Sequence, residues 1–442
     1  DEYLPSILPA LESSMTRDYT ALSDQQLIAT LEQMNQEFTA RYEVHGKINF
    51  VIASASIYVD FYNEIMDPED ATEAYEALQG FPTLSLDAGK ALWALGRIVN
   101  KSSELSQLFE RHEPVQLQVE LAGSEIGRNF LQAFRDYLEE WGWRSEAFEL
   151  ADPSWREDPT VPLNAIQGYM RLDDSEDPKN KYQQAIKRRE ELLANARAAL
   201  AGQTEQLETF NALYLQAEPY ATLTEDHNFY IDQRGNTVMR LPILEMGGRL
   251  AKSGSIAETN DVFHLIFDDI KSGFSGTDHK SLLAGRKAEM EKWAKIVPMP
   301  TSGEPPPHEE GEGDPLGMAF AKFFGVPPEP SRDPDIIQGL GASPGTVQGT
   351  AKVVRTLAEA SKLKKGDIMV CEMTMPPWTP LFSIAGAVVA DTGGPLSHCA
   401  IVSREYKMPC VVGTVVGTAV IKDGMTLTVD GAKGIVRIDS RG

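Results

Sequence analysis

A single histidine stands directly after a turn-forming segment in the stretch GGPLSHCAIVSREYK, residues 393–407. The Gly-Gly-Pro sequence turns the chain and Ser397 is a preferred N-cap residue, so we expect His398 in the first turn of a helix. Backbone N–H groups there are unpaired and the helix dipole is positive, which favours a phosphoryl group. Imidazole is also nucleophilic near neutral pH. The pattern predicts a phosphorylated His398 whose phosphoryl oxygens contact Gly393, Gly394 and Ser397, and the alternative is a histidine that bonds only within its own turn.

Composition limits the partners that this histidine can serve. The chain has 442 residues and a formal net charge of -24, which argues against a nucleic acid or an anionic membrane surface as partner. No run of about 18 apolar residues predicts a membrane span. Three cysteines without a C-x-x-C pattern disfavour a zinc site or a disulfide framework, so we expect no metal ligand set and a cytoplasmic setting. The chain begins without Met and without a secretory signal, and this leaves open that upstream sequence is missing.

The chain divides into three parts by pattern. Residues 1–297 have helical periodicity, for example after the cap-like Ser23 and in residues 129–141, 180–200 and 203–217. Residues 298–335 are rich in Pro and Gly and are predicted to be a linker, with a short amphipathic segment, LGMAFAKFFGV, inside it. Residues 336–442 alternate short β-branched runs with one helix near His398, which predicts a compact α/β domain.

Motifs in this last part resemble those of a known family. GLGASPGTVQGTAKVV begins at Gly339, and it is followed in order by GDIMV, PPWTP, AVVAD and GGPLSHCAIVSREYKMPCVVGT. Together they resemble the mobile phosphohistidine domain of the phosphoenolpyruvate-utilising enzymes. The resemblance implies that His398 is phosphorylated and carried between two active sites by a swivelling domain. It also implies a phosphate contact for Arg404, whereas an exposed Arg-Glu pair on a solvated face is the alternative.

The helical part carries a second resemblance. WGWR at residues 141–144, PSW at 153–155 and EDHNFYID at 225–232 resemble the acceptor-binding region of rifampin phosphotransferases and phenylphosphate synthases. The relatives more often have His where this chain has Trp143, which favours a flat aromatic acceptor. The substrate-binding residues predicted from these motifs and from chemistry are Trp143, Arg144, Glu225, Asp226, Arg240 and His45. His227 is the predicted general base that takes the proton of the acceptor hydroxyl.

The sequence therefore predicts a multidomain enzyme, with a mostly α-helical N-terminal acceptor-binding domain and a C-terminal α/β swivelling phosphohistidine domain. Neither an ATP-grasp domain nor a phosphoenolpyruvate-binding barrel is recognisable. We expect a dikinase-type phosphotransferase subunit that phosphorylates a small phenolic acceptor and releases AMP and phosphate. ATP and Mg²⁺ would be bound by a separate ATP-grasp subunit or a missing domain. The alternatives are a rifampin-type antibiotic phosphotransferase fragment, a phosphoenolpyruvate synthase fragment and a non-catalytic phosphocarrier module.

Overall fold

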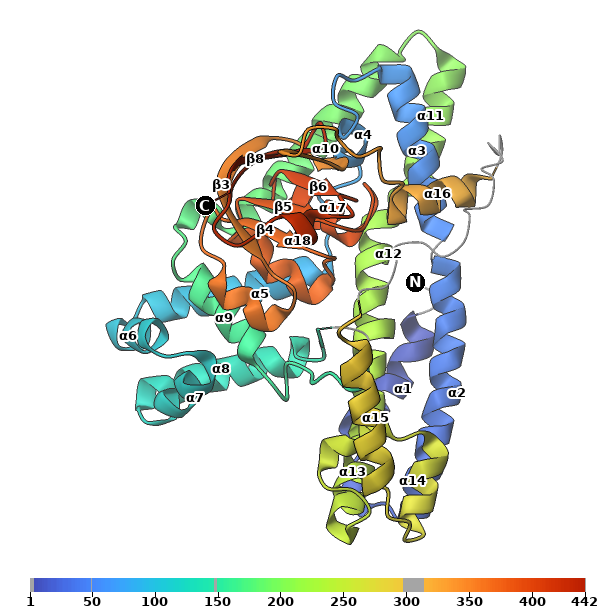
Figure 1. Ribbon diagram of the computed structural model, residues 1–442. Coiled ribbons are helices and arrows are strands. Elements are labelled where there is room, and N and C mark those ends of the chain that lie inside the picture. The colour runs from blue at the N-terminus through green and yellow to red at the C-terminus, as the bar shows by residue number, and fades with distance from the viewer. Residues whose placement is uncertain (1–3, 49, 147–148, 297–313, 442) are drawn as a thin grey trace. The chain divides into compact units, whose positions relative to one another are not determined.

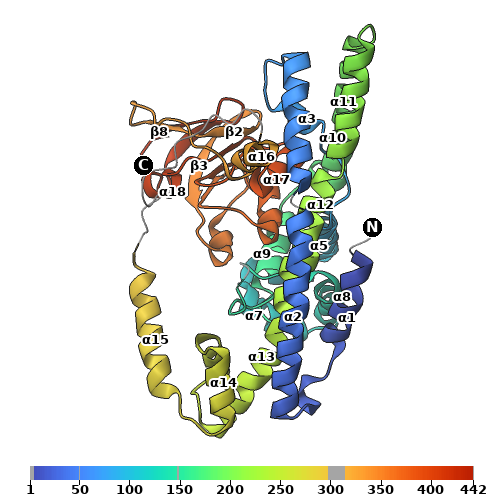
Figure 2. The same cartoon turned by 90° about the vertical axis from the view of Figure 1, so that its right-hand side faces the viewer.

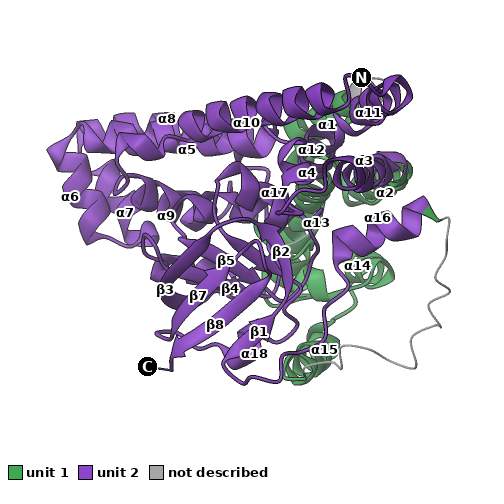
Figure 3. Cartoon of the chain, turned by 90° about the horizontal axis from the view of Figure 1, so that it is seen from above, with its two compact units in different colours: residues 1–46, 148–153, 230–314 green, residues 47–147, 154–229, 315–442 purple. Residues whose placement is uncertain are grey.

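The computed structural model describes residues 4–48, 50–146, 149–296 and 314–441. They form two compact units (Figure 3). Unit 1 comprises residues 1–46, 148–153 and 230–314, and unit 2 comprises residues 47–147, 154–229 and 315–442. The domain boundaries expected from the sequence stay a prediction. Among the described residues, none of the helices has both the length and the apolar character that crossing a membrane requires.

Unit 1 is built from helices. They are α1 (Leu4–Thr16), η1 (Tyr19–Ala21), most of α2 (Asp24–Ile48), α13 (Arg234–Ser253), η4 (Thr259–His264), α14 (Phe267–Phe274) and α15 (Lys280–Trp293). The helix start predicted at Ser23 is confirmed, because the Ser23 hydroxyl accepts from the Gln26 N–H at 3.2 Å and the Gln26 side chain accepts from the Ser23 N–H at 2.8 Å. Each side chain therefore pairs a backbone donor of the other residue, as in a capping box.

The helical part of unit 2 holds the remaining predicted helices. Its elements are α3 (Phe50–Met66), α4 (Glu73–Glu76), α5 (Leu84–Asn100), α6 (Ser103–Arg111), α7 (Pro114–Ala122), α8 (Glu125–Trp141), α9 (Thr160–Tyr169), η2 (Asp174–Glu176), α10 (Pro178–Ala199), α11 (Thr204–Ala217) and α12 (Tyr220–His227). The helices predicted at 129–141, 180–200 and 203–217 are confirmed as α8, α10 and α11. Figure 2 shows α10 and α11 beside α3, and Tyr58, Tyr62 and Phe210 pack together between α3 and α11. A π-helical turn, η3 (Asn228–Gln233), follows α12 in the chain.

The C-terminal sheet region, residues 336–441, is drawn in orange to red in Figure 1. It contains one eight-stranded mixed sheet in the order β1-β8-β7-β3-β4-β5-β6-β2. The strands are β1 (Ile336–Gln338), β2 (Leu340–Ser343), β3 (Thr346–Val353), β4 (Ile368–Cys371), β5 (Ala387–Ala390), β6 (Cys410–Val412), β7 (Thr426–Asp430) and β8 (Ile435–Ser440). Strands β3, β4, β5 and β6 pair in parallel, and β4 and β5 are buried along their whole length. Burial on both faces explains why these strands are unbroken apolar runs in the sequence.

The predicted helix at His398 is confirmed as α17 (His398–Glu405). The expectation of a single helix in this region is wrong, because three short helical segments also lie between the strands. They are η5 (Leu357–Lys362), η6 (Pro376–Ser383) and α18 (Gly417–Val420). The PPWTP motif forms η6, which begins at a proline, and proline is well suited to the first position of a helix because its missing N–H needs no partner there.

Helix α16 (Pro315–Phe324) lies in the segment expected to be a linker, of which residues 298–313 are outside the described residues. It packs along α3, where the Lys322 ammonium lies 2.5 Å from an Asp60 carboxylate oxygen and 2.9 Å from the Ser56 hydroxyl. The carbonyls of Lys322 and Phe323 accept the N–H groups of Leu396 (3.0 Å) and Gly394 (2.8 Å). The amphipathic segment therefore joins α3 to the turn that precedes His398.

Candidate functional site

The local structure around His398 is the one expected from its sequence. Ser397 has an extended backbone, and its side chain accepts from the Ala400 N–H, so it caps α17. Gly393 has a φ of 97°, in the left-handed region, which explains a glycine at the start of the turn. His398 is the first helical residue and its side chain is 12% exposed.

The His398 imidazole is held by one nitrogen. Its Nδ1 lies 2.8 Å from Oε1 of Glu225, a residue of α12 that is 2% exposed. The other oxygen of Glu225 accepts from the Ser85 hydroxyl at 3.0 Å, in the first turn of α5. The Nε2 of His398 is buried and has no hydrogen-bond partner among the described residues. Nδ1 is therefore hydrogen-bonded to Glu225, whereas Nε2 makes no hydrogen bond to the described residues.

The next residue of α12, Asp226, carries a second carboxylate, which contacts the start of α5. Thr83 caps this helix by accepting from the Leu86 N–H, and the Leu84 N–H donates to Asp226 at 2.8 Å. Burial raises the pKa of Asp226 to about 6, although the bond from Leu84 lowers it in part. A carboxylate that titrates this close to neutral pH is suited to accept a proton during catalysis.

Two side chains of the helical part bind backbone carbonyls on either side of His398. The Tyr220 hydroxyl donates to the carbonyl of Leu396 at 2.5 Å, and the Gln79 amide donates to the carbonyl of Ile401 at 3.2 Å. All of these groups are buried. The N-terminal half of α17 is thus fixed against α12 and against the segment between α4 and α5.

The predicted phosphate contacts differ in their surroundings. Ser397 caps the helix that begins at His398, but the Gly394 N–H is already donated to Phe323. Arg404 lies six residues after His398, about 9 Å further along the helix axis, where it is buried, donates to the carbonyl of Ala342 at 2.7 Å and lies over the Tyr75 ring. The contacts described for Arg404 are thus with Ala342 and Tyr75, and the phosphate contacts stay predictions.

Trp143 and Arg144 are buried after the end of α8. The indole N–H of Trp143 donates to the carbonyl of Glu139 at 2.9 Å, and the Arg156 guanidinium lies 4.4 Å from a ring centroid of Trp143. Arg144 donates to the carbonyl of Trp141 at 3.0 Å, and its guanidinium lies 4.2 Å from the centroid of the Phe229 ring. These contacts give both side chains a packing role within the helical part, and their contact with an acceptor stays a prediction.

The other predicted residues are divided between the units. His227, in unit 2, places its Nδ1 2.6 Å from the carbonyl of Leu223 one turn earlier. In unit 1, Arg240 donates to the carbonyl of Leu150 at 2.7 Å. Also in unit 1, the Nε2 of His45 lies 3.8 Å from Asp232, and burial lowers the pKa of His45. Among the predicted residues of unit 2, Glu225 contacts His398 directly, Ser397 caps the helix that His398 begins, and Asp226 follows Glu225 in the chain.

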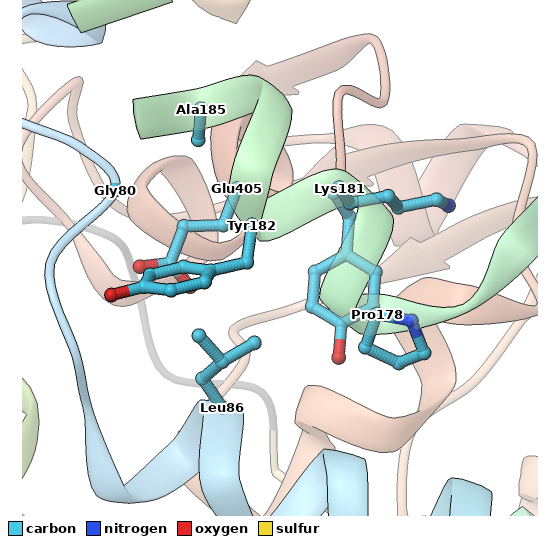
Figure 4. A pocket seen from close by; sticks show the side chains of 8 residues that line it. Gly80, Leu86, Pro178, Lys181, Tyr182, Ala185 and Glu405 are labelled. Carbon is cyan, nitrogen blue, oxygen red and sulfur yellow. The ribbon is translucent and has the colours of Figure 1, made fainter. Parts of the chain in front are cut away.

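Sequence reasoning missed two cavities. The larger, about 510 Å³, lies in unit 1 and is lined mainly by apolar side chains, including Leu31, Phe38, Ile243, Phe263 and Ile270. The smaller, about 10 Å³, lies in unit 2 between α5, α10 and the end of α17, where Leu86, Tyr182 and Glu405 face one another (Figure 4). Burial raises the pKa of Glu405 to about 8. No local sequence signal marks either cavity, because each is assembled from segments far apart in the chain.

Two segments of the chain match known domain families. Residues 45–225 match the rifampicin phosphotransferase fourth domain, and residues 363–434 match the mobile domain of phosphoenolpyruvate-utilising enzymes. The second match contains β4, β5, His398 and β7. The first match covers most of the helical part of unit 2 and a few residues of unit 1, and the second covers β4 to β7 of the C-terminal sheet region.

Three relatives cover most of this chain. Chondramide synthase cmdD of Chondromyces crocatus is 31% identical over 98% of this chain, but the matched region is 12% of its own length. The uncharacterized phosphotransferase YvkC of Bacillus subtilis is 30% identical over 99% of this chain and 52% of its own length. Rifampicin phosphotransferase of Streptomyces sviceus is 28% identical over 80% of this chain and 39% of its own length. The chain thus spans about half or less of the length of these relatives, and its two matched segments are similar to a rifampicin phosphotransferase domain and to the mobile domain of phosphoenolpyruvate-utilising enzymes.

Proposed function

We propose that this chain is the acceptor-binding and phosphohistidine-carrying part of an ATP-dependent, dikinase-type phosphotransferase. The observation that carries the proposal is His398, which begins a capped helix with Nδ1 on Glu225 and a buried, unpartnered Nε2. In the proposed reaction, Nε2 takes a phosphoryl group from ATP. A nucleotide-binding subunit or domain of the ATP-grasp type would hold ATP and Mg²⁺, and His398 is the residue of this chain that meets the phosphoryl group.

The second half of the reaction transfers the phosphoryl group to a hydroxyl of the acceptor. The acceptor oxygen attacks phosphorus, the P–Nε2 bond breaks, and its electron pair returns to the imidazole ring. The hydroxyl proton passes to a base, and Asp226 is suited to this because its pKa is raised to about 6. His227, the base predicted from the sequence, is the second candidate for this step. The product is a phosphate ester, together with AMP and phosphate from ATP.

We propose a small phenolic compound as the acceptor, as part of aromatic compound degradation, because the motifs of the helical part resemble those of phenylphosphate synthases. A second candidate is a larger, rifamycin-type acceptor. The match of residues 45–225 to the rifampicin phosphotransferase fourth domain supports it. A cavity of about 510 Å³ in unit 1, larger than a single phenol needs, also supports it.

The test uses the full chain together with its ATP-grasp subunit or domain, Mg²⁺ and ATP labelled in the β-phosphoryl group. We expect acid-labile, base-stable label on the chain, none on His398→Gln, and normal labelling of His112→Gln as a matched control. Chasing the labelled protein with phenol, cresol and a rifamycin, each in a separate reaction, then identifies the acceptor class. Absence of label on the wild-type chain, or label that survives in His398→Gln, would overturn the proposal.

A further inference from the structure

We propose that Glu225 is a positioning residue of the transfer step that acts through His398. Its carboxylate keeps a proton on Nδ1 of His398, and so activates the phosphohistidine, only while the C-terminal sheet region lies against α12. The inference rests on the proposed function and adds a control on where the phosphohistidine reacts. It gives Glu225 a role different from the acceptor contact that the sequence motif predicts.

The tautomer of His398 follows from its partner. Glu225 is almost fully buried, and its two oxygens meet Ser85 and His398. A carboxylate can only accept hydrogen bonds, so the imidazole must present an N–H at Nδ1. Nε2 then carries the lone pair, and this is the nitrogen without a partner among the described residues. The contact therefore prepares Nε2, once it is phosphorylated, as the leaving atom of the transfer step.

The charge balance of the transfer shows what Glu225 contributes. With a phosphoryl group on Nε2 and a proton on Nδ1, the ring is a cation, which the adjacent carboxylate stabilises in a poorly hydrated site. When the acceptor oxygen bonds to phosphorus, the P–Nε2 bond breaks and a neutral imidazole leaves with its Nδ1 proton still in place. If Nδ1 had lost its proton, the leaving group would be the much more basic imidazolate anion. Keeping this proton therefore lowers the barrier to breaking the P–Nε2 bond.

The phosphohistidine is activated only when the sheet region lies against α12, because the carboxylate and the imidazole lie on different segments of the chain. Glu225 and Ser85 belong to α12 and α5 of the helical part, whereas His398 belongs to the C-terminal sheet region. The bonds from Tyr220 to Leu396 and from Gln79 to Ile401 hold the two together at this point. A phosphohistidine that leaves α12 loses Glu225, so it is expected to be less reactive toward water and other acceptors during its transfer between sites.

The experiment measures the two half-reactions separately in the full chain with its ATP-grasp partner. Glu225→Gln keeps the size of the side chain and an acceptor oxygen for the Nδ1 proton but removes the charge. We expect the rate of His398 phosphorylation by ATP to stay within about twofold, and transfer to the acceptor to fall by about 100-fold, at the lower end of effects seen for catalytic acid–base groups. Glu208→Gln, on an exposed position of α11, is the matched control and should change neither rate.

Two further measurements separate catalysis from packing. Ser85→Ala removes only the second partner of Glu225 and should slow transfer less than Glu225→Gln does. In ¹⁵N-histidine-labelled phosphoprotein, the Nδ1 resonance should show an attached proton in the wild type, and a smaller protonated fraction in Glu225→Gln.

Each unfavourable result has a distinct meaning. Unchanged transfer in Glu225→Gln, equal slowing of both half-reactions, or a proton-free Nδ1 in the wild-type phosphoprotein would overturn the role of Glu225 while leaving the proposed function intact. A wild-type chain that never carries label on His398 would overturn both.

Discussion

The interior of the C-terminal sheet region differs from the surface that this region presents to the helical part. Inside, β4 and β5 are buried on both faces and contribute only apolar or small side chains, such as Val370, Val388 and Val389. Against the helical part, the contacts include hydrogen bonds from Tyr220 and Gln79 to backbone carbonyls. The interior is thus entirely apolar, whereas the contact with the helical part combines hydrogen bonds with buried apolar side chains such as Leu396 and Ile401.

The difference shows how one region can be both stable and separable. Removing apolar surface from water stabilises a core by about 25 cal/mol per Å². The interior of the sheet stays buried when the region moves, so this stabilisation is retained. A hydrogen bond between protein groups contributes only about 0.5–1.5 kcal/mol, because water can replace either partner after separation. The bonds at Leu396 and Ile401 therefore specify a position for His398 without making it permanent.

The largest expected effect on the free energy of unfolding comes from a substitution in the interior of the sheet region. Leu427 in β7 is fully buried, so Leu427→Ala should lower the free energy of unfolding by about 2–5 kcal/mol through lost burial and a residual cavity. Urea unfolding of the full chain measures it. Val119→Ala, at a side chain that is 64% exposed on α7, should change stability by less than about 0.5 kcal/mol. Equal effects of the two substitutions would contradict the contrast.

A second prediction concerns the carboxylate next to Glu225. Burial raises the pKa of Asp226 to about 6, above its value of about 3.9 in an unfolded chain, so the native state binds more protons between these pH values. Stability should therefore fall as pH rises from about 4 to 6, by up to about 3 kcal/mol for this group. Asp226→Asn still accepts from the Leu84 N–H and should stabilise the protein at pH 7.5, with little gain at pH 4.5, while slowing transfer. Urea midpoints at both pH values test this, and a gain of equal size at each would refute the linkage.

A third prediction tests the surface contact at Leu396. Tyr220→Phe removes one donor and should weaken docking by about 1 kcal/mol, which is about a fivefold loss in the rate of phosphoryl transfer. Phosphorylation of His398 by ATP should be unchanged. Tyr62→Phe is the control, because Tyr62 donates to Glu73 within the helical part and makes no bond to the sheet region in the contacts described. A similar loss in both variants would indicate general destabilisation.

The interior of the sheet region could be predicted from the sequence, and much of its surface could not. Apolar runs bounded by Gly and Asp identify β3 to β8, and the serine before His398 identifies the start of α17. Strands β1 and β2 were missed, since three or four residues beside glycine carry little periodicity. Local pattern is enough where neighbours along the chain decide the structure.

The candidate site shows the same limit. Glu225 and Asp226 were identified by their motif, but the partner of Glu225 is a residue 173 positions away, and only the fold brings the two together. The acceptor contact of Trp143 stays a prediction, and the sequence did not indicate that the Arg156 guanidinium lies over its ring. Side-chain type indicates what a residue is able to bind, and tertiary packing decides what it meets.

The smallest expected effect comes from α16, which bonds to α3 of the helical part and to the turn before His398. Lys322→Met removes the contacts with Asp60 and Ser56 on α3, and because this pair is partly exposed, the cost should be below about 1 kcal/mol. Hydrogen exchange is the sharper measurement, since the Gly394 and Leu396 N–H groups are protected by carbonyls at the end of α16. Both should exchange faster in the variant, while amides of the buried strands β4 and β5 keep their wild-type protection. Unchanged exchange at Gly394 and Leu396 would show that the turn before His398 is held without α16, and that the bonds from Tyr220 and Gln79 suffice to position it.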